Sequence, residues 1–354
     1  MPEEVEMLDF EAFKERYEKV PVEEYPNNVR EAVPEPVVSV HLLTYNHADY
    51  IREAIESVLM QEVDFPMEIV LGDDDSSDGT REICIEYAEQ HPDLIRLQLH
   101  HRENNRKLNG APTHLFQFYY NTFQLRGRYF AILSGDDYWT DPRKLQKQVD
   151  YLEIHPECSM VYHPWVARYP SDAGLSDDAL LQKRRAEGKT QRSSQYLTRV
   201  FRRSAFTFYR EGMNALCEDL FMGCVVRGQG EARLLDTIRP GVYRRSDHGL
   251  WKQGTAEYRR KHRAISLMLV AQALPVEDQP EGLPDLVIGS IEDYIMLGGQ
   301  MDLGVAVYLI SQGGVFAALH WGNASLIRRL LVALKNSIGI GIAGVKSSLL
   351  QYAS

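Results

Sequence analysis

The stretch Ile132-Leu-Ser-Gly-Asp-Asp-Tyr-Trp-Thr-Asp-Pro142 places two adjacent carboxylates directly after an apolar run. The run at 129–133 reads Tyr-Phe-Ala-Ile-Leu and predicts a buried strand. Like charges repel and burial disfavours a charged carboxylate, so Asp136 and Asp137 alone would not stabilise the end of a buried strand. The pair is therefore either a solvated turn that begins a helix or a ligand for a cation.

Strand and helix signals alternate on both sides of this stretch. β-Rich apolar runs predict strands at 37–43, 67–71, 94–99, 129–133 and 158–162. Apolar residues at helical spacing and turn or capping residues predict helices over 48–61, 80–90, 111–125 and 142–155. Strands separated by helices of this length predict βαβ units, and hence an α/β fold with a mainly parallel sheet flanked by helices.

Three polar clusters follow predicted strands at the point where each strand ends. They are Thr44-Tyr45-Asn46, Asp73-Asp74-Asp75 and Asp136-Asp137. Ligands of parallel α/β sheets bind beyond the carboxyl ends of the strands, so the three clusters are expected to converge on one crevice. A divalent cation there, Mn²⁺ or Mg²⁺, would suit carboxylate ligands and would offset the charge of a diphosphate leaving group.

Composition limits the other functions open to the chain. Its 354 residues carry a net charge of −11, which argues against nucleic acid as the main partner. The four cysteines have no zinc-ligand spacing and are typical of the reduced thiols of a cytoplasmic protein. The acidic N-terminus is not a signal peptide, and no run approaches the ~20 apolar residues of a membrane span.

The sequence divides into three parts. Residues 1–36 predict an N-terminal extension, 37–252 the α/β domain and 253–354 a largely helical C-terminal region. Within the domain, 165–210 reads as a basic insertion, which is either a solvated surface segment or a lid that contacts an anionic acceptor. The C-terminal stretch 325–350 has an apolar face and cations but no acid; it packs in a core or against a partner, or contacts an anionic membrane peripherally.

Three segments together resemble the family 2 glycosyltransferases, which have the GT-A fold, a Rossmann-like sheet, and use nucleotide-diphospho-sugars. The segments are VSVHLLTYNHADYIREAIESVLMQ (38–61), EIVLGDDDSSDGT (68–80) and YFAILSGDDYWTDPRKLQKQVDYL (129–152). They occur in the family's order and spacing, and the similarity covers about residues 37–163.

The resemblance implies a role for each cluster. Thr44 and Tyr45 match the positions that line the nucleobase pocket, and Asp74 matches the carboxylate that hydrogen-bonds the base, usually uracil. Asp136 matches the position near the ribose and Asp137 the metal ligand. The family pattern has Gly where this chain has Asp75, and an Asp is expected to keep the same turn because it tolerates left-handed backbone angles.

Later motifs imply the remaining roles. In LCEDLFMG, Asp219 is the candidate catalytic base, with Glu218 as the runner-up and surface solvation as the alternative. In YRRSDHGLW, His248 is a candidate for the metal or the diphosphate, although a lone loop histidine is more often structural. Arg244 and Arg245 are candidates for pairing with the diphosphate.

The resemblance therefore implies an inverting, metal-dependent transfer of sugar from a nucleotide-sugar, with UDP-sugar favoured, to an acceptor hydroxyl. Bacterial surface polysaccharide or glycolipid synthesis is the implied setting, with a glycan or lipid-linked acceptor, in the cytoplasm or peripheral to the inner face of the cell membrane. One rival is a sugar nucleotidyltransferase, but 44–49 lacks the Gly- and Lys-rich phosphate loop that such an enzyme needs. The other is a non-catalytic nucleotide-sugar-binding partner in glycan assembly.

Overall fold

The computed structural model describes residues 9–105, 107–108, 111–208, 213, 215 and 217–245, and the positions 262, 263, 266, 267, 270, 274 and 283. The chain separates into two compact units. The larger unit comprises Met7–Phe208 and Gln229–Asp247, and the smaller comprises Met1–Glu6, Tyr209–Gly228 and His248–Ser354. Apart from those seven positions, the predicted helical region 253–354 lies outside the described residues.

The described residues of the larger unit form an eight-stranded sheet in the order β1-β4-β3-β2-β7-β10-β8-β11. In that order the strands are Glu23–Glu24, Ile95–Leu99, Met67–Asp73, Val38–Thr44, Tyr129–Ser134, Val200–Arg202, Cys158–Tyr162 and Glu231–Leu234. The pairs β4–β3, β3–β2, β2–β7 and β8–β11 are parallel, whereas β1 and β10 run antiparallel to their neighbours. The predicted α/β fold with a mainly parallel sheet is confirmed.

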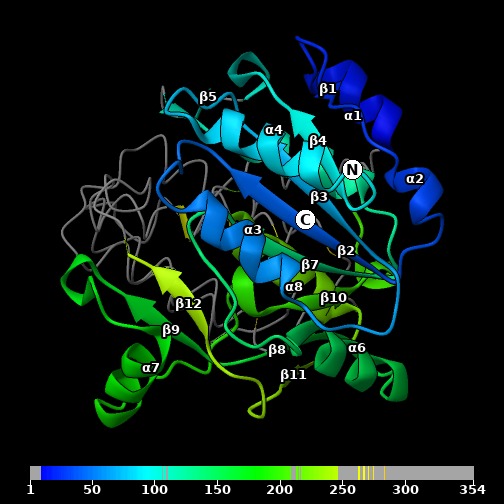
Figure 1. The fold of residues 1–354 in the computed structure, drawn as a ribbon. Coiled ribbons are helices and arrows are strands. Elements are labelled where there is room, and N and C mark those ends of the chain that lie inside the picture. The colour runs from blue at the N-terminus through cyan, green and yellow to red at the C-terminus, as the bar shows by residue number, and fades with distance from the viewer. Residues whose placement is uncertain are drawn as a thin grey trace, which may run out of the picture. The chain divides into compact units, whose positions relative to one another are not determined.

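Helices cover both faces of this sheet. On one face lie α3 (Ile51–Leu59), α4 (Thr80–Gln90) and α6 (Lys144–Ile154), and on the other lies α5 (Leu115–Gln124). In Figure 1, α3 and α4 are seen on the two sides of β2. The other helices and strands are α1 (Phe10–Tyr17), α2 (Val29–Ala32), β5 (Lys107–Leu108), β6 (Ala111–Pro112), β9 (Trp165–Arg168), α7 (Asp177–Ala186), α8 (Glu218–Gly228) and β12 (Gly241–Arg244). Short 3₁₀ turns occur at η1 (Arg102–Asn104), η2 (Pro170–Asp172), η3 (Tyr196–Thr198) and η4 (Arg203–Ala205).

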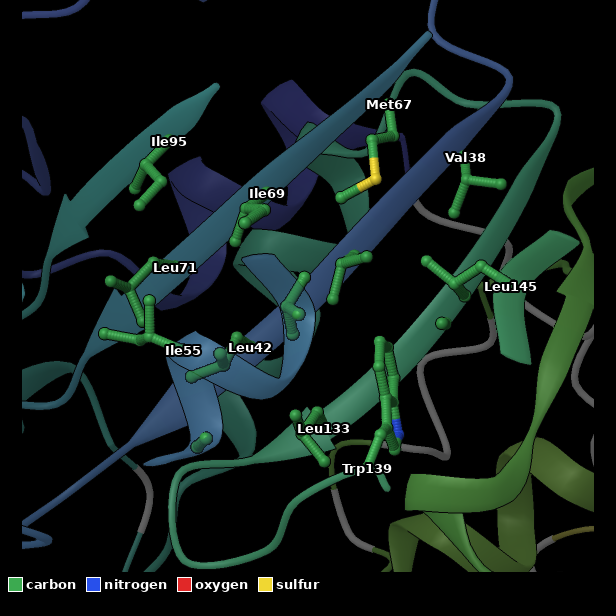
Figure 2. Close-up of a cluster of buried hydrophobic side chains, with 14 of the residues drawn as sticks. Val38, Leu42, Ile55, Met67, Ile69, Leu71, Ile95, Leu133, Trp139 and Leu145 are labelled. Carbon is green, nitrogen blue, oxygen red and sulfur yellow. The ribbon is translucent and has the colours of Figure 1, made fainter. Parts of the chain in front are cut away.

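The face under α3, α4 and α6 holds the apolar core. Alternate residues of each strand point to it, because side chains along a strand alternate between the two faces. Figure 2 shows Leu42 and Leu71, from neighbouring strands, beside Ile55 of α3, and Leu133 of the next strand beside Trp139. Burial of such side chains contributes about 1.5–3 kcal/mol each and holds the three parallel strands in register.

The opposite face, under α5, buries several polar side chains among apolar and aromatic ones. Glu68 is fully buried and accepts hydrogen bonds from Ser39 and from Arg126, whose Nη2 lies 2.5 Å from the Glu68 carboxylate. A side chain at Gly72 would place its Cβ 2.2 Å from Nδ2 of Asn121, so the glycine lets α5 approach the sheet closely. Burial lowers the pKa of His41 to about 3, so this histidine is neutral inside the fold at neutral pH.

The basic segment contributes a strand that the sequence pattern did not predict. β10 inserts between β7 and β8, antiparallel to both. A three-residue strand is too short to give a periodic signal, which explains why it was missed. Several of the segment's cations bind within the unit: Lys183 and Arg184 pair with the buried Asp172, and Arg202 donates to the carbonyls of Leu152 and Cys158.

Lys144, in the first turn of α6, provides a stability prediction. Its side chain is fully buried and its Nζ, 3.9 Å from the centre of the Trp139 ring, has no hydrogen-bond acceptor among the described residues. Burial lowers the pKa of Lys144 well below its usual value. We expect Lys144→Met to raise the free energy of unfolding at pH 7 by about 1–4 kcal/mol, because methionine fills a similar volume without a charge to desolvate.

The pH dependence of stability gives a second check on Lys144. The pKa of Lys144 is lower in the folded state than in the unfolded state. At pH values between these two pKa values the unfolded chain binds more protons than the folded chain, so the stability of the wild-type protein rises with pH across this range. Lys144→Met should lack that rise when urea unfolding is measured at pH 7 and pH 9.5. Lys147→Met is the matched control, because its ammonium pairs with Asp141 at 2.8 Å and is partly exposed. Equal or lower stability of Lys144→Met at pH 7 would contradict the prediction.

Candidate active site

Three loops meet at the carboxyl edge of the sheet because β3, β2 and β7 are adjacent and parallel. In the register of the sheet, Thr44 lies opposite Asp73 and Leu43 lies opposite Ser134. The polar clusters that follow the three strands therefore begin side by side, as the sequence predicted. Their roles in binding stay predictions.

The loops after β2 and β3 are hydrogen-bonded to each other. The amide of Asp74 donates to the carbonyl of Thr44 at 3.0 Å, and the amide of His47 donates to Oγ1 of Thr80 at 2.8 Å. Asn46 and Asp75 both have left-handed backbone angles, with φ of 51° and 64°. Asp75 thus adopts the turn in which the family pattern has Gly, as expected for an Asp.

Asp74 lies in a polar cage at this junction. Its carboxylate is buried, pairs with Nη1 of Arg102 at 2.7 Å and accepts from Nδ2 of Asn105 at 2.8 and 2.9 Å. Burial, only partly offset by Arg102 and Asn105, raises the pKa of Asp74 to about 6. The guanidinium of Arg102 lies 3.8 Å from the ring centre of Tyr45, so Tyr45 and Asp74 are joined through one planar cation.

The loop after β7 packs directly against the loop after β2. The amide of Gly135 donates to the carbonyl of Leu43 at 2.7 Å. A Cβ at position 135 would lie 2.6 Å from Oγ1 of Thr44, so this contact requires glycine. Thr44 itself is buried, and its Oγ1 lies 3.1 Å from Nδ1 of His47. The side chain of Thr44 thus serves the packing between loops.

Asp137 is buried at the end of this loop, whereas Asp136 is partly exposed. Oδ1 of Asp137 accepts from the amide of Arg244 at 2.9 Å. Burial, followed by the neighbouring charge of Asp136, raises the pKa of Asp137 well above its usual value. Within the described part of the chain, Oδ2 of Asp137 accepts no hydrogen bond. A hard divalent cation fits this donor set, because it would bind the remaining oxygen and favour the charged form.

A second group of possible metal ligands lies in the neighbouring loops. One ligand atom from each of Asp75, His101 and Glu103 lies within 4.8 Å of the others. This group was not foreseen from the sequence, because His101 and Glu103 follow β4 and no motif links them to Asp75. Among the described residues, Asp136 and Asp137 belong to no such group of three.

The remaining predicted site residues lie elsewhere. His248 lies outside the described residues. Asp219 lies in the first turn of α8, in the smaller unit, and its Oδ1 accepts from the amide of Leu220 at 2.7 Å. Its role as a base is untested by this geometry and remains a prediction.

Two arginines of the site were not foreseen in the roles that they have here. Arg102 was not singled out, since nothing in HHREN distinguishes it from a solvated cation. Arg244 was expected to pair with a diphosphate, which stays a prediction; in the structure its guanidinium contacts Glu53 and the carbonyl of Asp136. Arg245 is exposed and lies 4.7 Å from the ring centre of Tyr243.

The described helices include none that is both long and apolar enough to cross a membrane. The C-terminal stretch 325–350, on which the prediction of peripheral membrane contact depends, lies outside the described residues.

The chain is an α/β protein whose polar and acidic strand ends lie at the carboxyl edge of the sheet, where the ligands of such sheets bind. The family model described as Glycosyl transferase family 2 matches residues 39–215, half of the chain. The chain therefore belongs to glycosyl transferase family 2, and the resemblance seen in its sequence is confirmed.

Individual relatives and solved structures are similar to this chain over different ranges. An uncharacterized protein of Mycobacterium tuberculosis is 33% identical over 230 residues, which cover 63% of this chain and 63% of that protein's own length. The putative teichuronic acid biosynthesis glycosyltransferase TuaG of Bacillus subtilis is 33% identical over 117 residues, covering 33% of this chain and 42% of TuaG. Among solved structures, the mannosyltransferase PcManGT of Pyrobaculum calidifontis, in complex with GDP-Man and Mn²⁺, has a TM-score of 0.46 and 22% identity, covering 92% of this chain and 93% of PcManGT.

Proposed function

We propose that this protein transfers a sugar from a nucleoside-diphospho-sugar, with a UDP-sugar favoured, to an acceptor hydroxyl with inversion at the anomeric carbon. The observation that carries the proposal is the junction of the loops after β2, β3 and β7, where Tyr45, Asp74 and Asp137 come from adjacent strand ends of a family 2 chain. The region that this chain shares with its mycobacterial relatives covers 63% of their length. The activity of the whole protein is therefore part of the proposal.

The base of the nucleotide is proposed to bind at Tyr45 and Asp74. Tyr45 already accepts one planar group on its ring, the guanidinium of Arg102, and Asp74 accepts hydrogen bonds from two N–H donors. A base with a ring N–H, as uracil has, offers the same combination of a flat face and a donor. In the proposal it takes the position on Tyr45 that Arg102 holds here.

Asp137, through the oxygen that accepts no described hydrogen bond, and Asp136 are the proposed anchor for a divalent cation and the ribose. A bound Mn²⁺ or Mg²⁺ would supply charge that stabilises the departing diphosphate. The acceptor oxygen attacks the anomeric carbon, the bond from that carbon to the diphosphate oxygen breaks, and the acceptor proton passes to the base, for which Asp219 is proposed. The teichuronic acid named for TuaG supports a surface polysaccharide as the class of acceptor.

Tyr45→Ala tests the base position. We expect the affinity for UDP in the presence of Mn²⁺ to fall by about 5- to 150-fold, because stacking of a base on an aromatic ring contributes about 1–3 kcal/mol. Isothermal titration calorimetry measures this loss. Tyr169→Ala is the matched control, since Tyr169 also has an arginine, Arg184, over its ring but lies in the basic segment. Unchanged affinity of Tyr45→Ala would remove Tyr45 from the nucleotide site.

A ligand panel tests the function as a whole. Calorimetry with UDP, GDP and dTDP, each with and without Mn²⁺, is expected to give metal-dependent binding with UDP preferred. Mass spectrometry of nucleotide-sugars incubated with the protein and Mn²⁺ should then detect release of the nucleoside diphosphate. Metal-dependent binding without hydrolysis or transfer to any acceptor would favour the alternative, a non-catalytic partner in glycan assembly. Failure to bind any nucleotide would contradict both.

A further inference from the structure

Strand β12 is joined to the acidic loop after β7 although the two are far apart in sequence. The amide of Tyr138 donates to the carbonyl of Val242 at 3.2 Å, and the amide of Val242 donates back to Tyr138 at 2.9 Å. Arg244, two residues further along β12, donates its amide to Oδ1 of Asp137 across 107 positions of the chain. The last strand of the larger unit therefore sets where the Asp137 carboxylate lies.

The side chain of Arg244 holds the same loop from a second direction. Its Nη1 donates to the carbonyl of Asp136 at 3.0 Å, and its Nη2 pairs with Glu53 at the start of α3. The guanidinium carbon lies 5.1 Å from the ring centre of Tyr50 and 4.5 Å from that of Tyr138. Only 12% of the Arg244 side chain is exposed, and both of its terminal nitrogens are engaged.

The partners of Arg244 connect two parts of the site. Glu53 and Tyr50 belong to the start of α3, directly after the loop that carries Tyr45, whereas Asp136 and Tyr138 flank Asp137. A planar guanidinium with fixed donors suits such a bridge, because it fixes the direction of each hydrogen bond, which a lysine ammonium does not. The hydrogen bond from the Arg244 amide engages Oδ1 of Asp137, and among the described residues Oδ2 of Asp137 has no hydrogen-bond donor.

We propose that Arg244 is a positioning residue, which holds the loop of Asp136 and Asp137 so that Oδ2 of Asp137 is directed to a divalent cation. The inference rests on the proposed function for the identity of that cation. The contacts with Glu53 and with the carbonyl of Asp136 use two of the five N–H donors of Arg244, and the positioning role depends on these two contacts. Arg244 acts through Asp137 and does not touch the reacting atoms.

The test is the Mn²⁺ affinity of Arg244→Gln and Arg244→Lys, measured in the presence of saturating UDP from the electron paramagnetic resonance signal of free Mn²⁺. We expect Arg244→Gln to weaken Mn²⁺ binding by about 10- to 100-fold, the usual effect of losing a residue that orients a metal ligand. Arg244→Lys should recover only part of the loss, whereas UDP affinity without metal should stay within about twofold of wild type in both. Arg128→Gln, which removes an arginine from an exposed pair with Glu153, is the matched control and should not change Mn²⁺ affinity.

Glu53→Gln provides an independent variant should Arg244→Gln not fold. It leaves Arg244 in place but removes the charge of its partner, which is half exposed, so folding should persist with a smaller loss of Mn²⁺ affinity. If Arg244→Gln folds and binds Mn²⁺ with wild-type affinity, the positioning role is wrong and the proposed function still stands. If Arg244→Gln does not fold, wild-type Mn²⁺ affinity of Glu53→Gln has the same meaning. A wild-type protein that binds UDP but no Mn²⁺ would overturn both the positioning role and the metal dependence.

Discussion

Replacement of Asp137 by asparagine is expected to abolish Mn²⁺-dependent nucleotide binding and to reduce sugar transfer by at least about 10³-fold. A bound metal contributes several kcal/mol to stabilising charge in the transition state, and each 1.4 kcal/mol corresponds to a factor of ten in rate. Asparagine keeps the oxygen that accepts the Arg244 amide but loses the negative charge that a cation requires. Calorimetry with UDP, with and without Mn²⁺, together with initial rates of donor turnover, measures both effects.

The fold of Asp137→Asn should remain intact, which separates the loss of metal binding from a loss of structure. Burial raises the pKa of Asp137, so a neutral amide of the same shape has a smaller desolvation cost and thermal stability should be equal or higher. Asp150→Asn is the control, because Asp150 is an exposed residue of α6 that binds only Gln146 among the described residues. If Asp137→Asn kept the full Mn²⁺-dependent affinity, Asp137 could not be the metal ligand.

For Asp219→Asn we expect donor affinity near the wild-type value and turnover lower by on the order of 10²-fold or more. A general base acts only when the acceptor loses its proton, so its removal affects the chemical step rather than binding of the donor. Asp219 lies in the first turn of α8, where a carboxylate also interacts favourably with the helix N-terminus, and the loss of that interaction should cost about 0.3–1 kcal/mol of stability.

Turnover of Asp219→Asn at saturating donor and acceptor, compared with Glu218→Gln, decides between the two carboxylates of this turn. A large loss in Glu218→Gln with unchanged turnover in Asp219→Asn would transfer the role to Glu218. Unchanged turnover in both variants would place the base elsewhere in the chain.

The strands and helices of the sheet could be predicted because their signals are local. Each of β2, β3, β4, β7 and β8 is rich in apolar or β-branched residues, and the helices between them carry apolar residues at helical spacing. The buried polar side chains under α5 had no such signal: Ser39 and Glu68 interrupt the apolar runs, and only the tertiary structure shows that they bind each other and Arg126. β10 was not predicted because a strand of three residues flanked by arginines shows no alternation of apolar and polar residues.

The sequence by itself determined the α/β class and the three acidic or polar strand ends, since strand, turn and helix patterns are set by residues close together in the chain. It also determined the family, through motifs that retain their order. Only the tertiary structure decided which side chains these clusters meet. Arg102 joins Tyr45 to Asp74, and Arg244 reaches Asp137 from 107 positions away. Such partners are chosen by strand order and packing, which no local pattern encodes.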